Sequence, residues 1–401
     1  VEYNLGNKNG RQLLEELRTL HLISPDTLFI IVSAETDRAI VLGTMEMVPD
    51  DYIIKPFSQR LLDMRLQKSW NKRRAMSGIY NSVDKGDYAQ AITFSKQLIR
   101  DKNRHTAYII QLMTDFMCIE KQYDEVIKNL TSILKERELP WATIALARAY
   151  FGLNDLETAE RLLKDLISSN STQVAALDLL AKIQLAGSQS DAAKITLKKS
   201  IDISPFSTVR HELMVDIAKQ DNDLMLVKES YGQLLVLSRR SVHAGTNNLL
   251  NYTRSIIDTG SLCEEPREYH KIQNELNTAL HRAKQEEGRN LDYHFGVIEG
   301  VTQAQFQSEK GDNLAAKKTL MNAIHSFCDE DDEWNLPDEL ALDTCITLIN
   351  VKDFDLAQKF AKALEPGSVH AKDISMRLND DDLAAAQTEF KQITRQGIQA
   401  Y

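Results

Sequence analysis

The stretch that decides the fold is LARAYFGLNDLETAERLLKDL, residues 146–166, because its pattern returns in LAKIQLAGSQSDAAKITLKKSIDISP, residues 180–205. Identical residues recur in the two stretches at a spacing of 34: Leu146 and Leu180, Ala147 and Ala181, Ala159 and Ala193, Leu163 and Leu197. A fixed period of this length is typical of helical units that stack on one another. The recurring alanines are small, as is required where paired helices approach closely. The sequence therefore predicts a helical repeat array.

Both stretches resemble the tetratricopeptide repeat, a helix-turn-helix unit with this period. Weaker copies of the pattern precede and follow them, which gives about seven units in all. The copies are KGDYAQAITFSKQL (85–98), KQYDEVIKNLTSIL (121–134), IAKQDNDLMLVKESYGQLL (217–235), EKGDNLAAKKTLMNAI (309–324) and VKDFDLAQKFAKAL (351–364). We expect DDLAAAQTEFKQIT, residues 381–394, to form a closing helix. A helix pair cannot bury its apolar face alone, so the units are expected to stack into a superhelix with a concave surface.

Residues 1–66 follow a different pattern from the repeats. TLFIIVSAE (27–35) and DDYIIKPF (50–57) are compact apolar runs that suit buried strands of a parallel sheet. The first residues read as a further strand, and GRQLLEELRTL and DRAIVLGTMEM carry helical spacing. This alternation of strands and helices indicates a doubly wound α/β sheet.

The segment resembles the second half of the receiver domain of bacterial two-component response regulators. In EYNLGNKNG, Glu2 falls at the phosphoacceptor position, which the family fills with aspartate. Ser33 matches the hydroxyl residue that ends the family's fourth strand, and Tyr52 matches its switch aromatic. Lys55 and Pro56 match the lysine of the fifth strand and the proline that follows it in a cis peptide. The resemblance implies that these residues form a receiver site.

The residue types at this site fit phosphoryl chemistry. A carboxylate at a strand end can accept a phosphoryl group, and a hydroxyl and an ammonium group then hold the new oxygens while Mg²⁺ offsets the charge. The family's metal-binding acidic pair follows its first strand, which has no counterpart in this sequence. We therefore expect no cofactor, and Mg²⁺ only if the missing N-terminal half of the receiver is present.

Two interpretations of Glu2 are open. As a natural departure from aspartate, it places a permanent negative charge near Lys55 and Ser33, which either mimics the phosphorylated state or disables the site. Alternatively, it is the terminal residue of a truncated or engineered chain, since the sequence opens at Val1 within a strand and we expect residues to precede it. The longer side chain displaces an acyl phosphate by about 1 Å, enough to spoil a preorganised site. We expect no phosphoryl transfer to this chain.

From Ser58 to Asp84 the sequence contains one glycine, Gly78, and no proline, and its apolar residues keep helical spacing. We therefore expect one helix to run from the N-terminal segment into the first repeat, so that the two move as a rigid unit. KSWNKRR (68–74) forms a local basic patch around Trp70. Amphipathic coverage of the join explains this patch better than stacking on nucleic-acid bases, because the chain is acidic elsewhere.

The composition argues against several classes of function. The net charge of -10 and the pI near 5.5 disfavour binding to a phosphate backbone, so we expect no nucleic-acid partner. The longest apolar run is far too short to cross a bilayer, so we expect no membrane association. The cysteines are scattered and read as reduced thiols, so we expect a cytoplasmic location. His270 and His281 read as surface residues. No HExxH, GxSxG or P-loop motif occurs, so we expect no metal site, no catalytic residue and no enzyme.

Alignment on the repeat period predicts a partner groove on the first helices of the second to fifth repeats, because residues three, four and seven apart share a helix face. The predicted groove residues are Tyr108, Gln111, Asp115, Trp141, Arg148, Phe151, Asp178 and Lys182. Aromatic and arginine residues at the centre of a concave surface contribute most of the free energy of many interfaces. The alternative for Trp141 and Phe151 is that they only fill the packing between repeats.

The predicted fold class is mainly α: a tetratricopeptide α-solenoid preceded by a truncated α/β receiver (flavodoxin-like) domain. The predicted parts are a partial receiver (1–66), the first five repeats (67–240), an irregular helical insert (241–290), and further repeats with the closing helix (291–401). The acidic stretch CDEDDEWNLPDE, residues 328–339, reads as a solvated connection.

The sequence as a whole favours a response regulator that carries a two-component signal into protein–protein contacts, and not an enzyme. Its expected partners are other proteins, such as a sensor kinase or another response regulator, and a homodimer is compatible with the sequence. The alternative is a constitutive scaffold or adaptor in which the receiver is only a docking or dimerisation surface. A third hypothesis, a phosphotransfer sink, requires an aspartate and its acidic partners.

Overall fold

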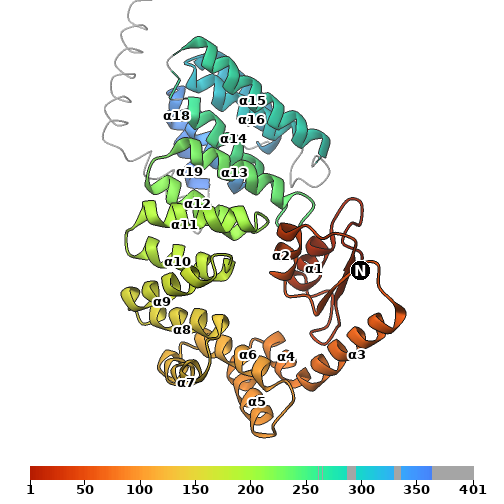
Figure 1. The fold of residues 1–401 in the computed structure, drawn as a ribbon. Helices are drawn as coiled ribbons and strands as arrows, with labels where there is room; N and C mark the ends of the chain where they lie inside the picture. The colour runs from red at the N-terminus through yellow and green to blue at the C-terminus, as the bar shows by residue number, and fades with distance from the viewer. Residues whose placement is uncertain (261, 264, 287–294, 329–335, 364–401) are drawn as a thin grey trace, which may run out of the picture. The chain divides into compact units, whose positions relative to one another are not determined.

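The structure is a computed structural model that describes the chain except for residues 261, 264, 287–294, 329–335 and 364–401. The expected closing helix therefore lies outside the described residues. The chain divides into two compact units: Val1–Asp223 with Arg240–Val242, and Leu224–Arg239 with His243–Tyr401. Both units consist mainly of α-helices (Figure 1), as the repeat pattern predicts.

The first unit opens with a small α/β segment. Its two helices and two strands are α1 (Gly10–Thr19), β1 (Ile30–Ser33), α2 (Arg38–Met45) and β2 (Asp51–Ile54). The strands pair in parallel, with Ile31 opposite Tyr52. These two residues form a core with Leu14 of α1 and with Phe29, which precedes β1. The two apolar runs that read as strands in the sequence are thus the two strands of the described sheet.

The sequence predicts a strand at the start of the chain, but the structure forms only a single bridge to β1 there. The prediction of a full strand is therefore wrong. Glu2 pairs in parallel with Val32 of β1, and Asn4 then pairs with Asn9 in an antiparallel bridge. Between Asn4 and Asn9, Gly6 takes a positive φ of 82°, which glycine adopts without steric cost. Because the chain turns back at this point, it leaves β1 before a longer ladder can form.

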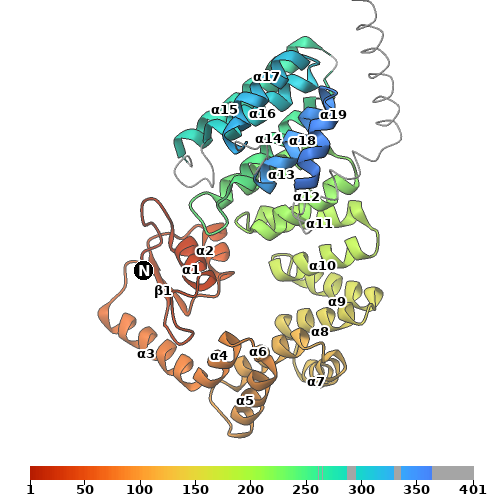
Figure 2. The same ribbon diagram turned by 180° about the vertical axis from the view of Figure 1, so that it is seen from behind.

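The expectation of one continuous helix between the segment and the repeats is also wrong. The helix α3 (Gln59–Ala75) ends at Met76, and α4 (Ser77–Asp84) follows. Met76 has φ −114° and ψ 14°, outside the range of an α-helix. Its side chain is fully buried beside Ile79 in the core of the first repeats. The backbone therefore leaves the helical conformation where α3 meets this core (Figure 2).

Arg73, near the end of α3, connects the N-terminal segment to the first repeat across this break. Its Nε donates to the Asp50 carboxylate at 2.8 Å, and its Nη1 donates to the carbonyl of Pro25. The guanidinium also lies over the ring of Tyr80 in α4, 4.7 Å from the ring centroid. These contacts bind the two parts to each other although the helix between them is interrupted.

The repeat helices of the first unit follow one another along the chain, each packed against the next. They are α5 (Tyr88–Arg100), α6 (Thr106–Ile119), α7 (Tyr123–Glu136), α8 (Pro140–Gly152), α9 (Leu156–Ser169), α10 (Val174–Ala186), α11 (Ser190–Ile203) and α12 (Thr208–Gln220). The alanines that recur in the sequence, including Ala147, Ala159, Ala181 and Ala193, are fully buried. Their small size allows the close approach of helices that the sequence predicts.

The turns inside the repeats share one backbone conformation. A residue with positive φ recurs in them at Gly86, Lys121, Asn154, Ser188 and Asn222. In two of these turns the next residue is an aspartate that caps the second helix: Asp87 accepts from the N–H of Gln90, and Asp155 accepts from that of Thr158. Such caps satisfy backbone donors that a helix leaves free at its N-terminus. The repeat period is therefore visible in the backbone as well as in the sequence.

The second unit contains further helices. They are α13 (Leu224–Ser238), α14 (Thr246–Gly260), α15 (Pro266–Glu286), α16 (Phe295–Glu309), α17 (Asn313–Ile324), the short 3-10 helix η1 (His325–Phe327), α18 (Asp338–Asn350) and α19 (Phe354–Ala363). α14 and α15 occupy the stretch predicted as a helical insert. A Cβ on Gly300 of α16 would lie 2.5 Å from that of Ala323, so glycine is required for α17 to approach this closely. None of the helices described in either unit is long and apolar enough to cross a membrane.

Candidate functional site

The parallel strands bring three of the predicted receiver residues together. Because β1 and β2 end at the same edge of the sheet, Ser33 and Lys55 lie near each other there, and the bridge at Glu2 adds its carboxylate. The Lys55 ammonium donates to the Glu2 carboxylate. The Ser33 side chain is buried, and its Oγ accepts from the N–H of Glu35 at 3.0 Å. The peptide bond between Lys55 and Pro56 is cis, as the resemblance implies.

Electrostatic interactions at this edge stabilise the ionised form of Glu2. The hydrogen bond from Lys55 is the largest cause that lowers the pKa of the Glu2 carboxyl. The Tyr52 hydroxyl donates to the carbonyl of Glu35 at 3.1 Å, and burial raises the pKa of this tyrosine. The cluster therefore contains a preformed carboxylate–ammonium pair next to a buried hydroxyl. Within the described residues, no group of three or more His, Cys, Asp or Glu side chains could hold a metal ion.

The predicted groove residues lie on α6, α8 and α10, the first helices of successive repeats. Asp115 of α6 accepts from Arg148 of α8 at 2.8 Å, and both side chains are more than one-third exposed. Burial raises the pKa of the Asp115 carboxyl, and Arg148 opposes this shift. Lys182 of α10 is exposed, and Gln111 of α6 is half-buried. The structure thus places Asp115 and Arg148 in direct contact on one surface of the repeats.

The aromatic residues of the predicted groove lie deeper than the charged ones. Trp141 and Phe151 are half-buried and pack against two different hydrophobic cores of the repeats. Tyr108 is also half-buried, and the Lys72 ammonium of α3 lies 3.2 Å from its ring centroid. Packing between repeats therefore accounts for much of the surface of Trp141 and Phe151, and Tyr108 contacts the connection to the N-terminal segment.

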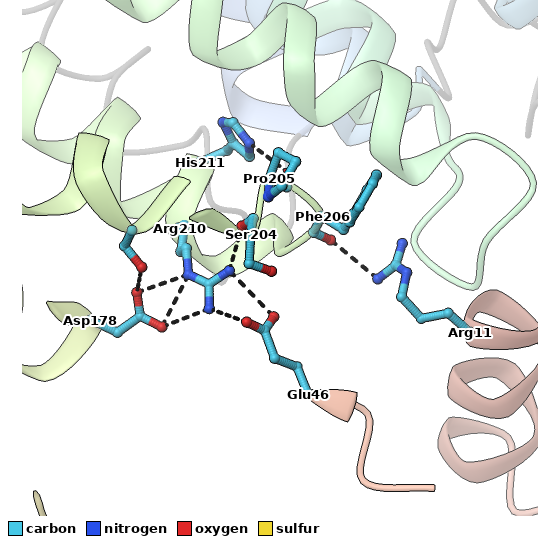
Figure 3. A network of polar contacts seen from close by, with 9 residues as sticks. Arg11, Glu46, Asp178, Ser204, Pro205, Phe206, Arg210 and His211 are labelled. Atoms are coloured by element: carbon cyan, nitrogen blue, oxygen red, sulfur yellow. Dashed lines mark hydrogen bonds and ion pairs between the residues drawn. The ribbon is translucent and has the colours of Figure 1, made fainter. Parts of the chain in front are cut away.

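Asp178 takes part in an interaction that the sequence analysis missed. It accepts two hydrogen bonds from Nε and one from Nη2 of Arg210 in α12, at 2.8 to 3.0 Å. The same guanidinium donates to Glu46, directly after α2, at 2.7 and 3.3 Å, and to the carbonyl of Ser204 at 2.7 Å. Figure 3 shows Arg210 between the two carboxylates. Its side chain is only 6% exposed. Arg210 therefore joins the N-terminal segment to the repeat array.

Phe206 adds an apolar part to the same contact. A Cβ on Gly43 of α2 would lie 2.7 Å from a ring carbon of Phe206, so the absence of a side chain at this position makes room for the ring. Arg11 of α1 donates to the carbonyl of Phe206 at 3.1 Å, and its guanidinium lies 5.9 Å from the ring centroid (Figure 3). The turn between α11 and α12 thus docks on α1 and α2. In the sequence, the features that point to this contact are Gly43, which interrupts an apolar helical stretch, and the turn residues Ser204, Pro205 and Phe206.

The comparisons with known proteins agree with a helical repeat protein. Residues 119–183 match the family model of the tetratricopeptide repeat, so the chain contains tetratricopeptide repeats, as predicted. The match does not reach residues 1–66, where the resemblance to a receiver stays a prediction. No curated protein matches the sequence.

Among solved structures, the chain is similar to a tetratricopeptide repeat protein from Parabacteroides merdae, with 13% identity and a TM-score of 0.35 over 69% of this chain and 98% of that one. It is also similar to the C-terminal part of a tetratricopeptide repeat-containing protein from Cytophaga hutchinsonii. There the identity is 14% and the TM-score 0.37, over 65% of this chain and 97% of that one.

Proposed function

We propose that this chain is an adaptor that binds other proteins through the first helices of its repeats, and that its N-terminal segment is a docking surface built against the array. The contact of Arg210 with Glu46 and Asp178 carries the proposal (Figure 3). A buried guanidinium that bridges two carboxylates requires a defined arrangement of all three groups. The segment is therefore proposed to act as part of the binding protein rather than as a separate module.

The charged surface of α8 and α10 supports the first half of this proposal. Arg148 and Lys182 are exposed on helices whose other faces fill the repeat cores. Tetratricopeptide arrays use extended surfaces of this kind to bind segments of other proteins.

Reversal of two charges tests the binding surface. Proteins recovered from lysate by the wild-type chain are compared with those recovered by Arg148→Glu plus Lys182→Glu. We expect at least one partner to be lost, since truncation of a central interface residue commonly costs about 2 kcal/mol, roughly thirtyfold in affinity. Quantitative mass spectrometry measures the recovery, and circular dichroism checks the fold.

The matched control reverses Lys128 and Lys198, which are exposed on the second helices α7 and α11. This control changes the net charge by the same amount on a different surface. If the control and the test variant lose the same partners, or if neither loses any, the first helices are not the binding surface.

A second candidate is favoured by the strand-end cluster. The convergence of Glu2, Ser33 and Lys55, together with the cis peptide at Pro56, is compatible with a degenerate receiver in a two-component response regulator. In that case the segment carries a signal to the repeats, with a sensor kinase or another response regulator as the partner. The carboxylate–ammonium pair of Glu2 and Lys55 then takes the place of a phosphorylated acceptor.

This candidate predicts no phosphoryl transfer from acetyl phosphate in the presence of Mg²⁺. Lys55 already binds Glu2, and the longer side chain displaces an acyl phosphate from the preorganised position. Phosphate-affinity gel electrophoresis measures the transfer, with a competent receiver protein as positive control. A stoichiometric, base-labile product that maps to Glu2 contradicts the prediction.

A further inference from the structure

A groove of about 500 Å³ lies within the second unit between α13, α14 and α15. Its volume falls in the range of clefts that bind ligands. Its polar lining includes Lys228 and Gln233 of α13, Arg239 directly after that helix, and Asn274 and Arg282 of α15. None of these residues belongs to the contacts or surfaces of the first unit described above.

The floor of the groove is a polar network held in place by packing. The Lys228 side chain is 15% exposed, and its ammonium donates to Glu275 at 2.9 Å. The Tyr252 hydroxyl lies 3.4 Å from the other oxygen of this carboxylate. A Cβ on Gly232 would lie 3.1 Å from the ring of Tyr252, so the ring packs closely against a position without a side chain. The floor therefore consists of the Tyr252 ring beside the ion pair of Lys228 and Glu275, which has no net charge.

The charge of the groove is opposite to that of the chain. Its lining contains three cations, Lys228, Arg239 and Arg282, and two carboxylates, Glu229 and Glu275. The lining is thus net positive, whereas the whole chain has a net charge of -10. Charge complementarity steers a partner of opposite sign to such a surface. This favours an acidic ligand.

The groove continues across α15 into a second hollow of about 600 Å³. The two hollows share Asn274, Thr278 and Arg282, which are four residues apart and form one stripe of α15. An elongated ligand that follows the groove can therefore pass over this stripe. A compact anion would occupy only one of the two hollows.

The side chains of Gln233, Asn274 and Asn277 each offer both donors and acceptors of hydrogen bonds, which is the combination that a peptide backbone requires. Val236, 52% exposed at the rim, and Tyr252 offer apolar surface. We propose that this groove binds an extended acidic peptide segment of a partner protein, with a carboxylate directed to Arg282. The inference rests on the proposed function and deepens it by naming the chemistry of one partner.

Fluorescence anisotropy with the full chain tests the groove. The probe is a fluorescein-labelled peptide of alternating glutamate and leucine, and the matched peptide has glutamine in place of each glutamate. We expect the glutamate peptide to bind at least about tenfold more tightly, with an affinity that falls as salt screens the charges. Equal binding of the two peptides, or no binding of the glutamate peptide, overturns the proposal.

Substitutions on α15 locate the binding site. Arg282→Glu is expected to weaken binding of the glutamate peptide at least tenfold. Arg267→Glu makes the same charge change on the same helix outside the groove and is expected to leave binding unchanged. Thr278→Trp is expected to fill the groove and abolish peptide binding. Thr278→Ala leaves the groove open and is expected to keep peptide binding. Thr278 is exposed, so both variants are expected to fold, which circular dichroism checks.

Two results distinguish this proposal from its alternatives. If Arg267→Glu weakens binding as much as Arg282→Glu, the peptide responds to charge in general and the groove assignment is wrong. If Arg282→Glu changes the sedimentation of the chain alone, a second copy occupies the groove and the proposal is wrong. If the wild-type chain does not bind the glutamate peptide, while partners are lost on charge reversal of α8 and α10 as expected, only this inference is overturned. If the wild-type chain binds the peptide in the groove but charge reversal of α8 and α10 affects no partner, only the surface proposed for the first unit is overturned.

Discussion

Replacement of Arg210 by glutamate is expected to detach the N-terminal segment from the repeat array. The guanidinium is 6% exposed and lies between Glu46 and Asp178. Loss of one partner of a buried ion pair commonly costs about 3–5 kcal/mol. Because the substitution also places a third carboxylate beside two others, we expect the contact to lose at least about 3 kcal/mol.

Hydrogen–deuterium exchange read by mass spectrometry measures this release. Exchange is expected to accelerate in α1, α2 and the turn around Phe206, while α8 and α9 keep their protection, since local opening exposes only the amides near the broken contact. Uniform acceleration along the whole first unit means that Arg210 supports the fold in general and does not act as a specific docking residue.

Arg148→Glu provides the matched control for Arg210→Glu. It makes the same change in net charge, but Arg148 and Asp115 are 45% and 41% exposed. Exposed ion pairs contribute only about 0.2–1 kcal/mol, so exchange of α1 and α2 is expected to be unchanged. Gly43→Leu tests the contact by another route, because its side chain would overlap the ring of Phe206. It is expected to reproduce the exchange pattern of Arg210→Glu without altering any charge.

Replacement of Asp343 by alanine is expected to destabilise the second unit. Asp343 of α18 is 2% exposed and accepts two hydrogen bonds from Arg254 of α14, at 2.7 and 2.8 Å. Arg254 also donates to the carbonyl of Glu339 and to the side chain of Asn251. Without Asp343, a nearly buried guanidinium loses the carboxylate that it binds directly and keeps its hydrogen bonds to two neutral groups, the Glu339 carbonyl and the Asn251 side chain. We expect the free energy of unfolding to fall by about 3–5 kcal/mol.

The double variant Arg254→Met plus Asp343→Leu distinguishes the loss of a partner from the loss of packing. It replaces both charges with apolar side chains of similar size, and buried pairs replaced in this way often keep or gain stability. We expect most of the lost stability to return. Urea unfolding followed by circular dichroism measures the change, and exchange in α14 and α18 assigns it to the second unit. If the double variant is as unstable as Asp343→Ala, the stability of the second unit depends on packing at this position and not on pairing of the two charges.

The repeat array could be predicted because its information is local. The recurring alanines at 147, 159, 181 and 193 mark close contacts between neighbouring helices, and these residues are buried. The bend at Met76 could not be predicted in the same way. The sequence on both sides favours a helix, and the interruption falls at Met76, whose side chain is buried in the repeat core.

The candidate sites show the same division. Lys55 and Ser33 could be placed together because both follow parallel strands that end at one edge, and Asp115 could be placed near Arg148 by the repeat period. The role of Asp178 could not be derived, because its partner Arg210 also binds Glu46, more than one hundred residues away in the chain. No periodicity connects residues so far apart.

By itself, the sequence determined the class of the protein: helical repeats with a period of 34, preceded by alternating strands and helices. Those features depend on which face of each element is apolar and on contacts between neighbours in the chain. Only the tertiary structure decided that Phe206 packs against Gly43, that Arg210 joins Glu46 to Asp178, and that a net positive groove forms on an acidic chain. These features depend on the shape and charge of surfaces that meet only after the helices have stacked, and such complementarity leaves no regular pattern in the order of the residues.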